Sequence, residues 1–122
     1  MKVRAIRGAT TVVEDSKAAI ESAVVELVTT LMAKNKITEE DLISILFTAT
    51  PDLKSEFPAT AARTAGLSNT PLICAQELDI AGALTKTIRV MVHVYTAREK
   101  SEVEHIYLHG AVSLRRDLSI EN

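Results

Sequence analysis

Two arginines and one glutamate are placed where they could do chemistry. Arg7 and Arg89 each lie inside a segment that alternates like a β-strand, with apolar residues two positions away. Glu77 directly follows a short apolar run and is the acidic group expected near them. Guanidinium groups bind carboxylates through paired, charge-assisted hydrogen bonds. The pattern predicts a site for a small anion; a surface salt bridge and a structural ion pair are the alternatives.

Other reactive side chains give weaker signals. Cys74 lies in an apolar run, where a cysteine is more typical of packing than of nucleophilic catalysis. His105 and His109 are four residues apart, in a predicted strand and the turn after it, without the carboxylate pattern of a zinc protease. The four glycines are scattered, so no phosphate-binding loop is predicted. We therefore expect neither a metal nor a cofactor.

Period-two alternation assigns both arginines to strands. One strand is predicted over residues 2–13, and the clearest over residues 88–95. In the second, β-branched residues form one face and Arg89 lies on the other. The faces that carry the arginines comprise Val3, Ala5, Arg7 and Ala9 in the first strand, and Arg89, Met91, His93 and Tyr95 in the second.

A long amphipathic helix is predicted after the first strand. Asp15 or Ser16 can cap its start, and Asn35-Lys36 lies where it should end. Its apolar stripe has helical spacing and should pack on one face of the sheet. The stripe consists of Ile20, Ala23, Val24, Leu27 and Leu31.

Shorter elements are predicted in the rest of the chain, and together they indicate an α+β fold. We expect a mixed sheet of about five strands with one long covering helix and short helices, in a single domain over residues 1–122. The second face of the sheet needs cover, and association of subunits is an obvious source. The further elements are one short helical turn at 38–41, a buried strand at 42–49, a helix that begins at Pro58 and ends just before Gly66, strands near 71–76 and 105–108, and an amphipathic tail at 111–118.

Composition excludes several classes of function. The 122 residues carry 14 basic and 16 acidic side chains, for a net charge of -2, which argues against nucleic-acid or membrane-surface binding. No window is apolar enough for a membrane-spanning helix or a signal peptide. A single cysteine suggests a reducing compartment. We therefore expect a cytoplasmic protein with a small-molecule substrate.

Several segments, in order and with similar spacing, resemble the trimeric, non-helical class of chorismate mutase. No segment is decisive alone, but together they are specific, because they include charged residues within strands. The resemblance runs nearly end to end. Its segments are residues 3–12, 49–53, 57–59, Arg63, Cys74, 76–77, 88–91, 105–108 and 114–118.

The resemblance implies a homotrimer resembling an α/β barrel, with active sites in clefts between subunits. Such an enzyme rearranges chorismate to prephenate, in phenylalanine and tyrosine biosynthesis, with no cofactor and no covalent intermediate. By resemblance, Arg89 would donate to the ether oxygen and a carboxylate, Arg7 and Tyr107 would bind carboxylates, and Glu77 would accept from the ring hydroxyl, with Cys74 beside it. The pocket would be lined by Phe57, Ala59, Ile73 and Leu114, with Arg63 and Arg115 at its mouth and the C-terminal tail closing over the ligand.

Three features depart from the pattern of the family, and two rival functions stay open. Thr60 replaces a lysine found in some relatives, Ile73 replaces a familiar threonine, and the segment between Gly66 and Pro71 is one residue short. These changes bear on substrate affinity more than on the reaction. The rivals are a trimeric deaminase acting on reactive enamines, which shares the architecture, and a binding module that has lost turnover.

Overall fold

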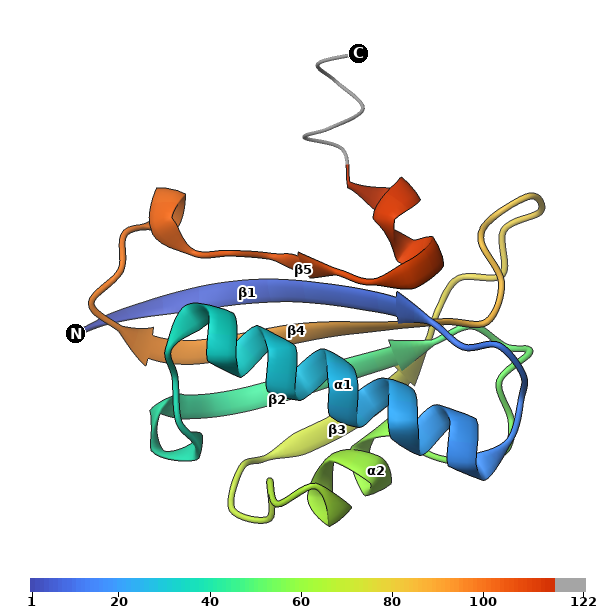
Figure 1. The fold of residues 1–122 in the computed structure, drawn as a ribbon, viewed down its shortest axis with the longest axis horizontal. Coiled ribbons are helices and arrows are strands. Elements are labelled where there is room, and N and C mark those ends of the chain that lie inside the picture. The colour runs from blue at the N-terminus through green and yellow to red at the C-terminus, as the bar shows by residue number, and fades with distance from the viewer. Residues whose placement is uncertain (116–122) are drawn as a thin grey trace.

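The computed structural model describes residues 1–115. The order of strands and α-helices is the predicted one (Figure 1). Of three short 3₁₀ helices in residues 1–115, the first lies at the turn predicted over 38–41 and the third overlaps the predicted tail, whereas the second was not predicted. The strands are β1 (Lys2–Thr11), β2 (Leu42–Ala49), β3 (Leu72–Gln76), β4 (Thr87–Thr96) and β5 (Ile106–Tyr107). The helices are α1 (Lys17–Asn35) and α2 (Pro58–Thr64), and the 3₁₀ helices are η1 (Glu39–Asp41), η2 (Lys100–Glu102) and η3 (His109–Leu114).

All five strands belong to one mixed sheet in the order β3-β2-β4-β1-β5. The central strand β4 is antiparallel to both β1 and β2, whereas the edge strands β3 and β5 run parallel to their neighbours. The predicted α+β class with a mixed sheet of about five strands is confirmed.

One face of this sheet is covered by α1, with α2 beside it (Figure 1). The predicted stripe of α1 is buried, and Leu27 has no exposed surface. Gly8 in β1 allows the close approach, because a Cβ atom there would lie 2.8 Å from Val90 Cγ1 and 3.2 Å from Leu27 Cδ1. The core therefore lies between α1 and this covered face.

The ends of α1 follow the predicted signals. The Ser16 hydroxyl accepts a hydrogen bond from the Ala19 N–H at 3.1 Å, so Ser16 is the cap. Asp15, the other predicted candidate, instead accepts from the backbone N–H groups of Lys54 and Ser55. Lys36 ends the helix in a left-handed conformation, with φ of 55°.

The opposite face of the sheet is open in the single chain. It exposes apolar side chains of which Val3 is 56% and Ile73 65% accessible, and the same face carries Arg7 and Arg89. The prediction that residues 42–49 form a buried strand is therefore wrong for one side of β2, where Leu46 is 37% exposed. The strand is as apolar as a fully buried one, but residues 1–115 cover only one of its faces.

Two smaller differences concern the limits of elements. β1 ends at Thr11 rather than at residue 13, and β5 is restricted to Ile106–Tyr107. The segment after β5 is the 3₁₀ helix η3, and the rest of the predicted tail over 116–118 lies outside the described residues. Within residues 1–115, no helix is long and apolar enough to span a membrane.

Candidate active site

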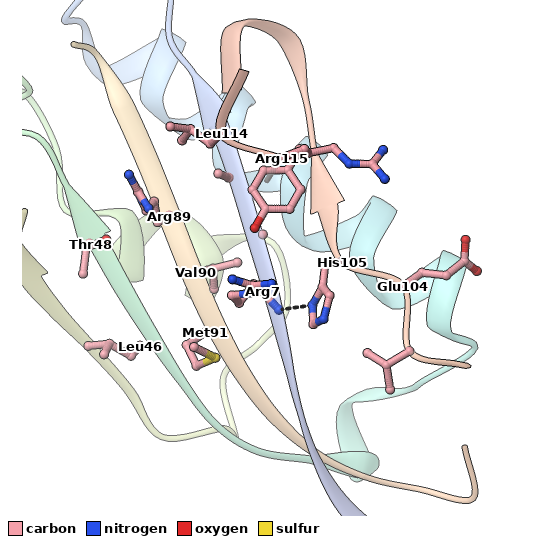
Figure 2. A pocket seen from close by; sticks show the side chains of 14 residues that line it. Arg7, Leu46, Thr48, Arg89, Val90, Met91, Glu104, His105, Leu114 and Arg115 are labelled. Atoms are coloured by element: carbon pink, nitrogen blue, oxygen red, sulfur yellow. Dashed lines mark hydrogen bonds between the residues drawn. The ribbon is translucent and has the colours of Figure 1, made fainter. Parts of the chain in front are cut away.

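The open face of the sheet is hollowed into a cavity of about 640 Å³. Figure 2 shows side chains from β1, β2 and β4 on one side of this hollow, and His105 and Arg115 from the chain around β5 on the other. Five of the predicted site residues line it: Arg7, Arg89, Tyr107, Leu114 and Arg115.

The register of the strands brings the first three of these together. Ala9 of β1 pairs with Arg89 of β4 on one side and with Tyr107 of β5 on the other. Paired residues on neighbouring strands project to the same face, and Arg7, two positions from Ala9, shares that face. Arg89 of β4 and Tyr107 of β5 therefore lie on either side of the small Ala9 side chain of β1.

The backbone around Arg7 and Tyr107 is held by two specific contacts. The Arg7 N–H donates to Nδ1 of His105 at 3.0 Å, which Figure 2 marks with a dashed line. On the other side of Tyr107, the Leu108 N–H donates to the Ala9 carbonyl at 2.9 Å. These bonds extend the pairing of β5 with β1 beyond the two residues assigned to the strand.

Glu77 and Arg89 form an ion pair, with 3.0 Å between Arg89 Nε and Glu77 Oε1. The Glu77 N–H donates to the Ala49 carbonyl at 2.9 Å, so the backbone that carries the carboxylate is held in place. The Arg89 side chain is 48% exposed, and an ion pair this open adds little to stability. The contact is made at Nε, which leaves the two terminal nitrogens of the guanidinium able to bind other oxygens.

A second cavity of about 910 Å³ adjoins the first. Glu77 and the loop that follows it form much of the wall, and Arg89 and Leu114 line both cavities. Arg89 therefore lies at the border between the two hollows, where one ligand can contact groups from both.

The first cavity favours an anion. Its lining contains Arg7, Arg89 and Arg115 against a single carboxylate, Glu104. Fixed cations in a concave surface raise the local concentration of negatively charged ligands. A dianion with separated carboxylates suits this arrangement better than a neutral or cationic molecule.

Two carboxylates have a lowered pKa, those of Asp15 and Asp52. They hold loops near the site and do not line the first cavity. The N–H of Lys54 is the main cause of the lowered pKa of Asp15, with further hydrogen bonds from Ser55. Burial alone would raise the pKa of Asp52, but hydrogen bonds from Thr50, from its own backbone and from Lys86 outweigh it and lower the value. Both groups are ionised acceptors that fix turns near the second cavity.

The remaining predicted residues form a separate group around α2 and β3. Phe57 and Cys74 line a third cavity of about 500 Å³. Ala59 is buried, and its N–H, in the first turn of α2, donates to Cys74 Sγ at 3.3 Å. Arg63 and Ile73 are exposed and do not line these three cavities. Within one chain the predicted site residues thus fall into two groups.

Sequence reasoning missed several residues of the first cavity. Thr48 pairs with Arg89 in the register, Met91 lies two positions along β4, and His105 contacts Arg7. The Thr48 Oγ1 atom is buried without a hydrogen-bond partner in the described part of the chain. The alternation of β4 and β5 could have suggested Met91 and His105, whereas Thr48 depends on a register that the sequence does not reveal.

No group of three or more His, Cys, Asp or Glu side chains in residues 1–115 is arranged to hold a metal ion. The arginines and Tyr107 that line the first cavity offer fixed charges and hydrogen-bond donors. Such a site can orient an anionic molecule and stabilise charge that develops within it.

Comparison with known proteins assigns this site to a family. The family model described as chorismate mutase type I matches residues 3–118, which includes both groups of predicted site residues. The chain belongs to the chorismate mutase type I family. The resemblance of its segments to the non-helical class is confirmed.

Named relatives agree with this assignment. The chain is 41% identical over 121 residues to chorismate mutase AroH of Bacillus subtilis (strain 168), covering 98% of this chain and 95% of that one. It is 44% identical over 117 residues to chorismate mutase AroH of Thermus thermophilus, covering 95% and 96%. The structure is similar to that of a chorismate mutase from Clostridium thermocellum, with a TM-score of 0.88, 45% identity, and 90% and 98% of the two chains covered. This protein is therefore a chorismate mutase, an isomerase of aromatic amino acid biosynthesis.

Proposed function

We propose that this chorismate mutase rearranges chorismate to prephenate in a cleft shared by neighbouring copies of the chain. The observation that carries the proposal is the position of Arg89, paired with Glu77 at the border of two cavities on the open face of the sheet. Arg7 and Arg115 line the same hollow, and chorismate is a dianion. The excess of arginines in the lining suits this substrate.

The open face supports a homotrimer. Side chains such as Val3, Ile73 and Tyr95 are exposed on it, and surfaces of this kind favour association. A head-to-tail interface can close into a ring of three copies. Each cleft then lies between two chains, and one chain contributes the group around Arg89 while the other contributes the group around Phe57. In this proposal the group around Arg89 of one copy faces the group around Phe57 of its neighbour.

Arg89 is assigned the main catalytic role. Negative charge grows on the ether oxygen as its bond to carbon breaks, so a fixed cation there stabilises the transition state more than the ground state. The contact with Glu77 orients the guanidinium before the substrate arrives. Glu77 also accepts from the ring hydroxyl of chorismate in this proposal.

Arg7 and Tyr107 are assigned to positioning. The reactive conformer of chorismate is folded and sparsely populated, and two anchors for its carboxylates raise that population. Arg7 and Tyr107 lie on the same face of neighbouring strands, and Tyr107 pairs with Ala9, two positions along β1 from Arg7. The rearrangement occurs within one molecule, so it needs neither a nucleophile nor a base from the protein.

The activity test uses purified protein and chorismate. We expect the ultraviolet absorbance of chorismate to decay and an equal amount of prephenate to appear. Sedimentation should give the mass of three chains. Binding of a transition-state analogue without turnover would favour the non-catalytic module, and ammonia release from an enamine would favour a deaminase.

We also propose the cytoplasm as its compartment, which suits the single cysteine and an enzyme of amino acid biosynthesis.

A further inference from the structure

Asn35, the last residue of α1, is a buried polar side chain that the proposed chemistry does not use. It is 2% exposed, and three hydrogen bonds satisfy its carboxamide. Nδ2 donates to the carbonyl oxygens of Leu31 and Glu104, each at 2.9 Å, and Oδ1 accepts from the Glu104 N–H at 2.9 Å. The first of these bonds stays within α1, whereas the two bonds to Glu104 leave the helix.

The two bonds to Glu104 have the pattern of strand pairing. A carboxamide has two N–H donors, and one of them lies beside the C=O acceptor, in the way that a single residue of an extended strand presents its own N–H and C=O to a neighbouring strand. Asn35 therefore pairs with the backbone of residue 104 at the point where the chain enters β5. The Asn35 side chain is buried, and it projects from the last turn of α1, which packs in the core. Its position is therefore well fixed.

β5 needs such an anchor because it is only two residues long. Its pairing with β1 covers Ile106 and Tyr107, and the Leu108 N–H adds a bond to Ala9 after the strand. Before the strand, Asn35 adds a second fixed point to the hydrogen bond between the Arg7 N–H and His105. The backbone on both sides of Tyr107 is thus fixed, by Asn35 before the strand and by the Leu108–Ala9 bond after it.

We propose that Asn35 is a positioning residue for the rearrangement, acting through β5 on the Tyr107 hydroxyl. This inference rests on the proposed role of Tyr107 in binding a carboxylate of chorismate. A displacement of about 1 Å in a positioning group can cost up to about 100-fold in rate. Removing the Asn35 carboxamide loses both bonds to Glu104 and leaves the Arg7–His105 bond to hold this end of β5, so Tyr107 shifts and binds the carboxylate less well.

The test is a double-mutant cycle on the full-length protein, with Asn35→Ala and Tyr107→Phe. We expect Asn35→Ala alone to lower kcat/KM about tenfold, mainly through a higher KM. In the Tyr107→Phe background the same substitution should cost less than about threefold, since the hydroxyl it positions is already absent. Measurements are made well below the melting temperature of every variant.

Ser16→Ala is the matched control. It removes the cap at the other end of the same helix, where the Ser16 hydroxyl accepts from Ala19. We expect it to lower the melting temperature and leave kcat/KM within about twofold, because a cap contributes to stability only. This control separates weakening of α1 from displacement of β5.

A second variant covers the case in which Asn35→Ala does not fold. Asn35→Asp keeps the shape and the acceptor for the Glu104 N–H but loses both donated bonds, and it should show the same coupling with Tyr107→Phe. Equal costs in the two backgrounds, or unchanged kcat/KM, would overturn the role of Asn35. A Tyr107→Phe variant with normal activity would instead overturn the proposed role of Tyr107 itself.

Discussion

The two faces of one sheet differ in what the chain itself provides for them. On the covered face, Ile88, Val92 and Val94 are at most 1% exposed beneath α1. On the open face, the same strand carries Arg89 and Tyr95, which are exposed. Alternation along β4 therefore places core residues on the covered face and the proposed catalytic group on the open face. Substitutions at neighbouring residues of β4 can test stability and turnover separately.

The largest effect is expected on the open face. Arg89→Ala should keep the fold and lower kcat about 100- to 1000-fold, because it removes a preorganised donor from the developing charge. The decay of chorismate absorbance measures this. Arg4→Ala is the control: Arg4 lies in β1 and donates to the Arg98 carbonyl, outside the lining of the first cavity. Near-normal turnover by folded Arg89→Ala would refute the assignment.

The neighbouring residue tests the covered face. Ile88→Val deletes one methyl group from a side chain with no exposed surface, and should lower the free energy of unfolding by about 0.5–1.5 kcal/mol. Turnover per folded molecule should not change. Denaturant unfolding and the chorismate assay measure the two quantities. A large loss of turnover at full folding would show that the two faces are not separable.

A smaller effect concerns the turns at the edge of the sheet. Asp15 accepts hydrogen bonds from Lys54 and Ser55, which lower its pKa from the ordinary 3.8. A lowered pKa means that this stabilisation is present above the unfolded value and is lost as the pH falls through the folded value. Asp15→Asn should therefore lower the melting temperature at pH 7. The difference from the parent protein should shrink below about pH 3.8; a difference independent of pH would contradict this.

The smallest effect is expected at Cys74. Its thiol accepts from the Ala59 N–H, and a serine hydroxyl can accept the same bond. Cys74→Ser should keep kcat within about twofold, since the rearrangement requires no nucleophile. Steady-state kinetics of the assembled protein provide the measurement. An inactive but properly assembled variant would indicate that the thiol takes part in the reaction.

The fold could be predicted from the sequence largely because local signals agree. The stripe on α1, its Ser16 cap and the alternation around Arg89 each depend on spacing within one segment. β2 shows the limit of such reasoning, because Leu46 is as apolar as a buried residue but lies on the open face. Burial depends on what covers a strand, and composition does not state whether that cover comes from the same chain.

The site was less predictable for the same reason. Alternation could place Arg7 and Arg89 on exposed faces of their strands, but only the register brings Tyr107 level with Arg89 across Ala9. The pairing of Asn35 with Glu104 joins residues 69 positions apart, and no local pattern indicates it. The roles drawn from the family resemblance remain predictions that the variants above test.

The shared cleft is tested most directly by mixing two variants that are each inactive. Arg89→Ala disables the group on the open face, and Phe57→Asp places an anion in the other group, where it repels the dianionic substrate. In randomly assembled trimers, about one quarter of the clefts combine an intact group from each variant. Differently tagged copies that purify together confirm that subunits have exchanged.

We predict that co-refolded mixtures of equal amounts regain about one quarter of the parent activity, while parent protein mixed with Arg89→Ala retains about half. Activity that stays at the level of the separate variants, in mixtures whose tagged copies do purify together, would contradict a site built from two neighbouring chains.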